Sequence, residues 1–99
     1  MTGDENREFR IDFTVQARID LVSLLQRAVG RPAFVEIEAA YLRVQERLRT
    51  SARSIGDPLY HLRAMKMTVM SLTEPPLYIG FGVHDEEPVV VVRAIRMIR

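Results

Sequence analysis

The sequence contains no cysteine and no tryptophan, and its apolar residues never form a long uninterrupted run. Without cysteine, disulfides, thiolate zinc sites and cysteine nucleophiles are excluded. The apolar run at residues 89–92 is far shorter than the roughly 20 residues that cross a bilayer, and no basic-then-apolar leader opens the chain. We therefore expect a soluble, cytoplasmic protein with no membrane partner.

A strong excess of either charge is also missing, because 14 basic and 13 acidic side chains leave a formal net charge of +1. Basic residues are concentrated in residues 43–66, which hold six of them against two acidic residues. A dedicated nucleic-acid-binding domain is usually more basic than this. With 99 residues, of which 47% are apolar, the chain is long enough for one domain with its own core. We assign residues 8–99 to that domain and residues 1–7 to a flexible N-terminus.

The N-terminal half changes from a strand pattern to a helix pattern. Residues 9–13 alternate apolar and polar side chains, which indicates a half-buried strand. Apolar residues then follow three-and-four spacing, with Thr14 as the predicted N-cap and Gly30 as the end of the helix. Pro32 suits the first turn of a second helix, and the turn signal at residues 54–58 ends the helical region. The short connection predicts an antiparallel helical hairpin.

The C-terminal part is predicted to form three strands, at residues 65–72, 77–83 and 89–98, separated by turn residues. Their short connections predict an antiparallel meander. The order of strand, two helices and three strands predicts an α+β fold with the helices on one face of the sheet. The last strand is apolar on both sides, whereas a sheet covered on one face should show a polar second face. We expect a partner protein, or a second copy of this chain, to cover that second face.

Three stretches carry a resemblance to a known family. They are "FTVQARIDLVSLL" with Phe13, Ala17, Asp20 and Leu21, "IGDPLYHLRAM" with Leu62, Arg63, Ala64 and Met65, and "PPLYIGFGVHDEEPVVVVRAI". Through them the chain resembles the RelE/ParE superfamily of type II toxin-antitoxin toxins over about residues 8–98. The resemblance implies an antitoxin partner, and a target such as gyrase or the ribosome with its RNA.

The chain departs from the pattern of the messenger-RNA-cleaving members. Where the resemblance implies an arginine, a tyrosine and a second basic residue on one strand, this chain has Tyr78, Phe81 and Gly82. RNA cleavage requires groups that neutralise phosphate charge and transfer protons. We therefore expect a toxin-like protein that acts by binding, without this ribonuclease chemistry and without a cofactor.

Two alternatives remain open. One is an active ribosome-dependent ribonuclease whose basic groups have moved, and the other is a non-toxic dimeric interaction module. The first would rely on His61, Arg63, Lys66, Arg93 and Arg96.

Two glycines lie two residues apart in the strand predicted at residues 77–83, where bulky side chains are usual. Alternation places them on the face opposite the helices, and glycine permits close approach of another backbone. We predict a docking groove for a partner segment, formed by Tyr78, Gly80, Gly82, His84, Met70 and Val91.

Three arginines are candidates for contact with a nucleic acid or another macromolecular target: Arg43, Arg47 and Arg63. Arg43 and Arg47 share a helix face, and a solvated surface is the alternative interpretation. Arg63 precedes a predicted strand, where it either reaches a phosphate or anchors a carboxylate such as Asp57.

His61 and the stretch at residues 84–87 contain metal-ligand residue types. The stretch is typical of a hairpin turn closed by proline, and the spacing does not bring His61 to it. We predict no metal site.

Overall fold

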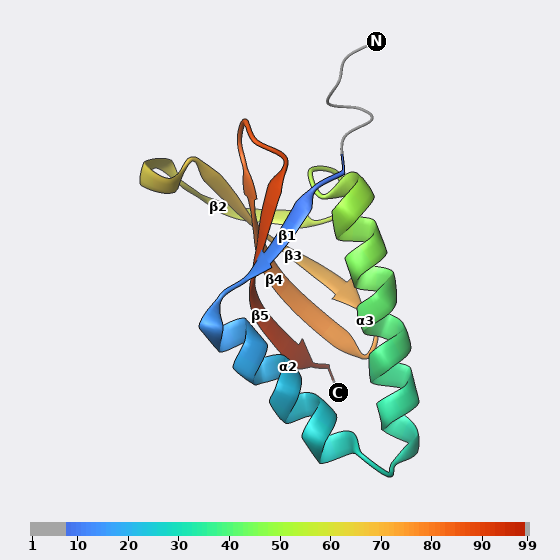
Figure 1. Cartoon of the computed structure of the whole chain (residues 1–99). Helices are drawn as coiled ribbons and strands as arrows, with labels where there is room; N and C mark the ends of the chain where they lie inside the picture. Colours follow the sequence, from blue (N-terminus) through green and yellow to red (C-terminus); the bar gives the residue numbers. More distant parts are fainter. Residues whose placement is uncertain (1–7, 99) are drawn as a thin grey trace.

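The computed structural model describes residues 8–98, which form a five-stranded sheet with two helices (Figure 1). The elements are β1 (Arg10–Phe13), α2 (Val15–Ala28), α3 (Pro32–Ser51), β2 (Asp57–Leu62), the 3-10 turn η1 (Arg63–Met65), β3 (Met67–Glu74), β4 (Leu77–His84) and β5 (Val89–Met97). The predicted α+β class is confirmed. Within residues 8–98, no helix combines the length and the apolar character needed to cross a membrane.

The sheet has the strand order β1-β5-β4-β3-β2. The last four strands are antiparallel neighbours, whereas β1 pairs in parallel with β5, with Arg10 opposite Val89 and Phe13 opposite Val92. The predicted meander is therefore extended at both edges, and the sheet is mixed. Strand β1 therefore lies beside β5 in the sheet.

The strand β2 was not predicted from the sequence, which indicated a turn at residues 54–58. Asp57–Leu62 pairs with β3 and forms an edge of the sheet, where Pro58 is tolerated because an edge strand has a free side. The register shifts between Pro58 and Tyr60, which interrupts the alternating pattern that would mark a strand. Lys66 has a left-handed backbone with φ of 51°, which reverses the chain after η1. The next strand, β3, then begins at Met67.

The two helices form the predicted hairpin. The Thr14 hydroxyl accepts a hydrogen bond from the Ala17 amide at 3.1 Å, which confirms Thr14 as the N-cap of α2. Gly30 has a φ of 78° and lets the chain turn sharply before Pro32 begins α3. The helices diverge from this turn, and α2 runs along β5 (Figure 1).

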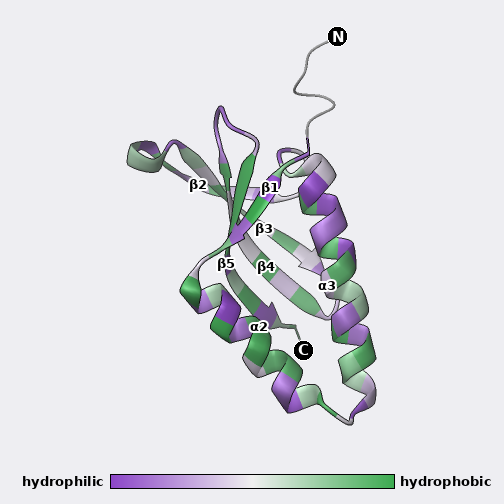
Figure 2. Ribbon diagram, viewed as in Figure 1, coloured by the Kyte–Doolittle hydropathy of each residue, from purple (hydrophilic) through white to green (hydrophobic). Residues whose placement is uncertain are grey.

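The main core lies between the helices and one face of the sheet. Ile79 and Phe81 of β4 are fully buried and belong to one cluster with Ile37 and Leu48 of α3. Both helices carry alternating hydrophobic and hydrophilic bands (Figure 2), as expected of helices with one buried face. We call the other face of the sheet the open face.

Candidate functional site

Both glycines of β4 lie on the open face. The residues between them and beside them, Ile79, Phe81 and Val83, point into the core. Alternation therefore places Tyr78, Gly80, Gly82 and His84 together on the open face, as predicted from the sequence.

The neighbouring strand β5 contains a bulge beside these glycines. Gly80 lies opposite Ala94, and Phe81 lies opposite Val92, so Arg93 is the extra residue. Beyond the bulge, Val91 lies opposite Gly82 and shares the open face with it. Val91 therefore lies on the same face as the two glycines, as the predicted groove requires.

Met70 lies on the other side of the sheet. It pairs with Phe81 and is 5% exposed within the main core, because its side of β3 faces the helices. The methionine that lies on the open face is Met67, which precedes it by three residues and was not among the predicted groove residues.

Met67 fills the space above Gly82. A Cβ atom built at Gly82 would lie 2.5 Å from the Met67 Sδ and 2.8 Å from its Cγ. At Gly80 the nearest atom would be the Ala94 Cβ at 3.6 Å, which is an ordinary contact. The predicted groove floor is therefore occupied at Gly82 by a side chain of the same chain, and only Gly80 leaves surface for a partner.

A hydrogen-bonded pair extends across the same face. The Arg93 Nη1 donates to the Tyr60 hydroxyl at 3.2 Å, although Arg93 is on β5 and Tyr60 is on β2. Strands β4 and β3 lie between them, so the two side chains must cross the sheet to meet. We call the Arg93–Tyr60 pair the strap, and the bare backbone at Gly80 leaves room for it.

The five residues of the ribonuclease alternative form two separate groups. Arg96 lies opposite Tyr78, so it shares the open face with Arg93. The other three, His61, Arg63 and Lys66, lie at the β2–β3 turn. Six residue steps of β3 separate Arg96 from this turn, which is about 20 Å at the rise of a strand. Arg93 lies nearer and reaches Tyr60 on the open face, whereas His61 lies opposite Thr68 on the helix side.

The predicted target contacts on α3 are engaged within the chain. Arg43 Nε and Arg47 Nη1 each lie 2.9 Å from a carboxylate oxygen of Glu74, at the end of β3. The hydrogen bond from Arg43, followed by that from Arg47, holds the pKa of the Glu74 carboxyl below its usual range against the opposing effect of burial. We call this group the Glu74 clamp, and it ties α3 to the β3–β4 hairpin.

Arg63 and Asp57 do not meet. They lie at opposite ends of the six-residue strand β2. The prediction that Arg63 anchors the Asp57 carboxylate is therefore wrong. Both side chains are exposed, and Arg63 projects at the β2–β3 turn.

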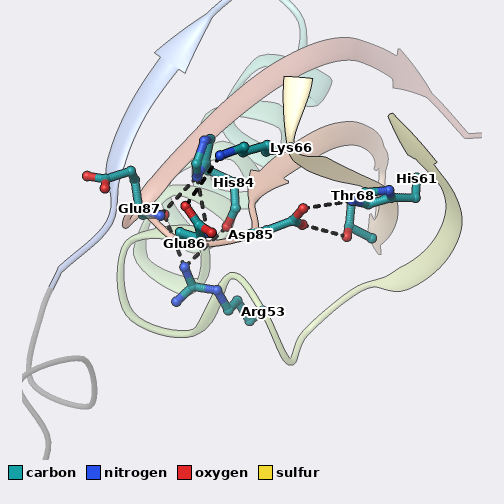
Figure 3. Close-up of polar contacts among 8 residues, drawn as sticks. All are labelled: Arg53, His61, Lys66, Thr68, His84, Asp85, Glu86 and Glu87. Carbon is teal, nitrogen blue, oxygen red and sulfur yellow. Dashed lines mark hydrogen bonds and ion pairs between the residues drawn. The ribbon is translucent and has the colours of Figure 1, made fainter. Parts of the chain in front are cut away.

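His61 does meet the acidic stretch, in contrast to the expectation from its spacing. Its Nε2 lies 2.7 Å from Asp85 Oδ2, and the Thr68 hydroxyl donates to Asp85 Oδ1 at 3.3 Å (Figure 3). The unpredicted strand β2 explains the contact, because it places His61 opposite Thr68. Hydrogen bonding to His61 is the main reason that the pKa of Asp85 is below its usual range.

The β4–β5 turn is held by side chains and backbone together. His84 Nδ1 accepts hydrogen bonds from the amides of Glu86 at 3.1 Å and Glu87 at 2.9 Å (Figure 3). Arg53, which follows α3, donates to the carbonyl oxygens of His84 and Glu87 at 3.2 and 3.0 Å. A cavity of about 260 Å³ beside the turn is lined by Arg53, Pro58, Thr68, Met70, Val83, His84 and Asp85. Within residues 8–98, no three acidic or histidine side chains are grouped as metal ligands.

Comparison with known proteins gives matches among solved structures. No protein-family model matches the sequence, and no curated protein matches it. A chain of the toxin-antitoxin complex RelBE2 from Mycobacterium tuberculosis has a TM-score of 0.67 and 21% identity, with 92% of each chain covered. A chain of the chromosomal ParDE TA system from P. aeruginosa has a TM-score of 0.61 and 14% identity, with 92% of this chain and 97% of that chain covered. The protein thus shares its fold with chains of RelBE2 and ParDE, as its resemblance to the RelE/ParE superfamily predicted.

Proposed function

We propose that this protein is the toxin-like component of a type II toxin-antitoxin pair, and that it acts by binding a macromolecule. The two solved structures that share its fold support the setting, because both come from toxin-antitoxin systems. The placement of His61 and the β5 arginines on opposite faces of the sheet is the observation that supports binding over RNA cleavage.

Cleavage of an RNA strand requires a proton acceptor, a proton donor and positive charge around one phosphate. Arg93 and Arg96 lie on the open face, whereas His61 lies opposite Thr68 on the helix side of the sheet. Arg96 is also about 20 Å along β3 from the β2–β3 turn at the rise of a strand. The sheet lies between His61 and these two arginines. His61 is also bound to Asp85, and Arg93 is bound to Tyr60.

The partner surface in this proposal is the part of the open face around Gly80. Tyr78 on the same strand and Val91, opposite Gly82, provide an aromatic and an aliphatic side chain on this face, and Gly80 allows a partner backbone to approach. An antitoxin segment is the proposed occupant in the cytoplasm, and gyrase or the ribosome is the proposed class of target. The alternative occupant is a second copy of the chain. The binding experiment distinguishes it from an antitoxin segment, because a second copy gives self-association.

Controlled expression in cells tests the toxin role. We expect growth arrest that is relieved when the product of the neighbouring reading frame is co-expressed, together with a stable complex of the two purified proteins. In the complex, Gly80→Leu should lower affinity at least about tenfold, because a bulky side chain obstructs the backbone approach. Gln26→Leu adds the same side chain on exposed α2 and serves as the matched control.

A cleavage assay on translating ribosomes tests the absence of ribonuclease chemistry. We expect no messenger-RNA cleavage by the purified protein. Cleavage that is lost in Arg63→Ala or Lys66→Ala would establish the ribonuclease alternative instead. Harmless expression with self-association that Gly80→Leu disrupts would establish the dimeric module.

A further inference from the structure

The β4–β5 turn depends on the protonation state of one imidazole. His84 Nδ1 is the acceptor for two backbone amides, those of Glu86 and Glu87 (Figure 3). A ring nitrogen accepts a hydrogen bond only when it carries no proton. The observed turn therefore requires neutral His84 with its proton on Nε2.

Protonation of Nδ1 is incompatible with these two hydrogen bonds. A third N–H would then point at two amide N–H groups, and both amides would lose their acceptor. Histidine is the side chain whose charge ordinarily changes between about pH 5 and 8.

Charged groups around His84 come from four elements. The turn itself carries Asp85, Glu86 and Glu87, and the β2–β3 turn carries Lys66, which lies 3.8 Å from Glu86. The segment after α3 contributes Arg53, whose guanidinium is bound to two turn carbonyls. On β1, Arg10 is paired with Asp12 at 3.2 Å.

The neighbouring His61 responds to acid in the opposite direction. Protonated His61 forms an ion pair with Asp85, to which it is already bound at 2.7 Å. The Asp85 amide also donates to the Lys66 carbonyl at 2.8 Å, which fixes the first residue of the turn to β3. Acid therefore strengthens the Asp85 end of the turn and weakens the part that begins at Glu86.

The weakened part leads to β1. Pro88 follows Glu87, and its carbonyl accepts a hydrogen bond from the Arg10 amide at 2.8 Å, where β1 begins to pair with β5. The Arg53 guanidinium also lies over the Phe9 ring at 5.0 Å. Movement of residues 86–88 thus acts on the N-terminal edge of the sheet.

We propose that the β4–β5 turn is a pH-sensitive latch, closed by neutral His84 and opened by its protonation, which loosens the start of β1 while Asp85 stays attached to His61. This inference does not depend on the proposed toxin role, because the latch is a property of the isolated chain.

Solution NMR of the full-length protein tests the latch directly. Long-range ¹H–¹⁵N spectra at about pH 7.5 should show the Nε2–H tautomer of His84. On acidification, the amide signals of Glu86 and Glu87 should shift with the same midpoint as the His84 ring. Protection of these two amides and of the Arg10 amide should fall by about fivefold, the equivalent of one lost hydrogen bond.

Two variants separate the latch from general acid effects. In His84→Asn, the side-chain oxygen accepts the same backbone amides but does not titrate, so the turn should stay closed in acid. In His61→Gln, the other histidine is removed, and the response of Glu86 and Glu87 should persist. An Nδ1–H tautomer at neutral pH, or an unchanged acid response in His84→Asn, would overturn the proposal. If His84→Asn fails to fold, the tautomer and the shared midpoint in the wild-type chain decide the question.

Discussion

The Met67 side chain occupies the volume that any side chain at position 82 would require. Its Sδ lies 2.5 Å from where a Cβ of residue 82 would be, although the two residues belong to different strands. Met67 itself is 5% exposed. Glycine at position 82 thus serves the packing of the open face, and Gly80 is the glycine that is available to a partner.

Alanine at the two glycines should have opposite effects on stability. Gly82→Ala forces Met67 to move and should lower the free energy of unfolding by about 1–2 kcal/mol, as overpacking does. Gly80→Ala meets only an ordinary contact and should be neutral or stabilising, because alanine loses less backbone entropy than glycine. Denaturant unfolding at neutral pH measures both. The loss in Gly82→Ala should shrink in a Met67→Ala background, and equal stabilities of the two alanine variants would contradict the steric account.

The Glu74 clamp should contribute stability that depends on pH. Glu74→Gln removes the charge that Arg43 and Arg47 share and should lower the free energy of unfolding by about 1 kcal/mol near neutral pH. Because the pKa of Glu74 is lowered in the fold, this contribution is present above the ordinary glutamate pKa and is lost as pH falls through the lowered value. Wild type and variant should therefore converge in acid. Glu46→Gln, which affects the exposed pair with Arg49, is the control and should cost less.

The link between His61 and Asp85 should be visible in the titration of Asp85. Removing the imidazole in His61→Gln should raise the pKa of Asp85 toward its ordinary value, because hydrogen bonding to His61 is the largest cause of the lowered pKa. The stabilisation from this link is present above the ordinary aspartate pKa and is lost as pH falls through the lowered one. Carboxyl ¹³C NMR measures the shift. Thr68→Val should produce a smaller change in the same direction, and an unchanged Asp85 titration in His61→Gln would refute the contact.

Removal of the strap should help a partner to dock at Gly80. Tyr60→Phe deletes the hydroxyl that holds Arg93, so a partner no longer has to break that hydrogen bond. We expect about fivefold tighter binding of the antitoxin-like partner, in line with the net value of one hydrogen bond. Calorimetry of the purified proteins measures it, with Tyr41→Phe on α3 as the control. Weaker binding in Tyr60→Phe would mean that the partner uses the strap instead of displacing it.

The elements that could be predicted from the sequence are those with local signals. Thr14 marked the start of α2, and the alternating residues of β4 placed Tyr78 and Gly80 on the correct face. It missed β2, because Pro58 and the register shift beside it remove the strand pattern. With β2 missing, nothing brought His61 near the acidic turn.

The long-range ion pairs could not be predicted from the sequence either. Glu74 is 31 residues from Arg43 and 27 from Arg47, so helix periodicity alone left these arginines as a free basic face. A usable signal did exist for Met67. Once β3 and β4 are paired through their short turn, Met67 falls opposite His84 and diagonal to Gly82, and a long side chain beside a glycine is expected to cover it.

The pairing of β1 with β5 has a consequence for the order of events during synthesis. β1 lies at an edge of the sheet and pairs with β5, so it has no strand partner until residues 89–97 have emerged from the ribosome. The helical hairpin and the strands β2 to β4 have local partners and can assemble earlier. A nascent chain arrested before β5 would expose both edges of β1 and one edge of β4, and would be a ready substrate for chaperones and proteases.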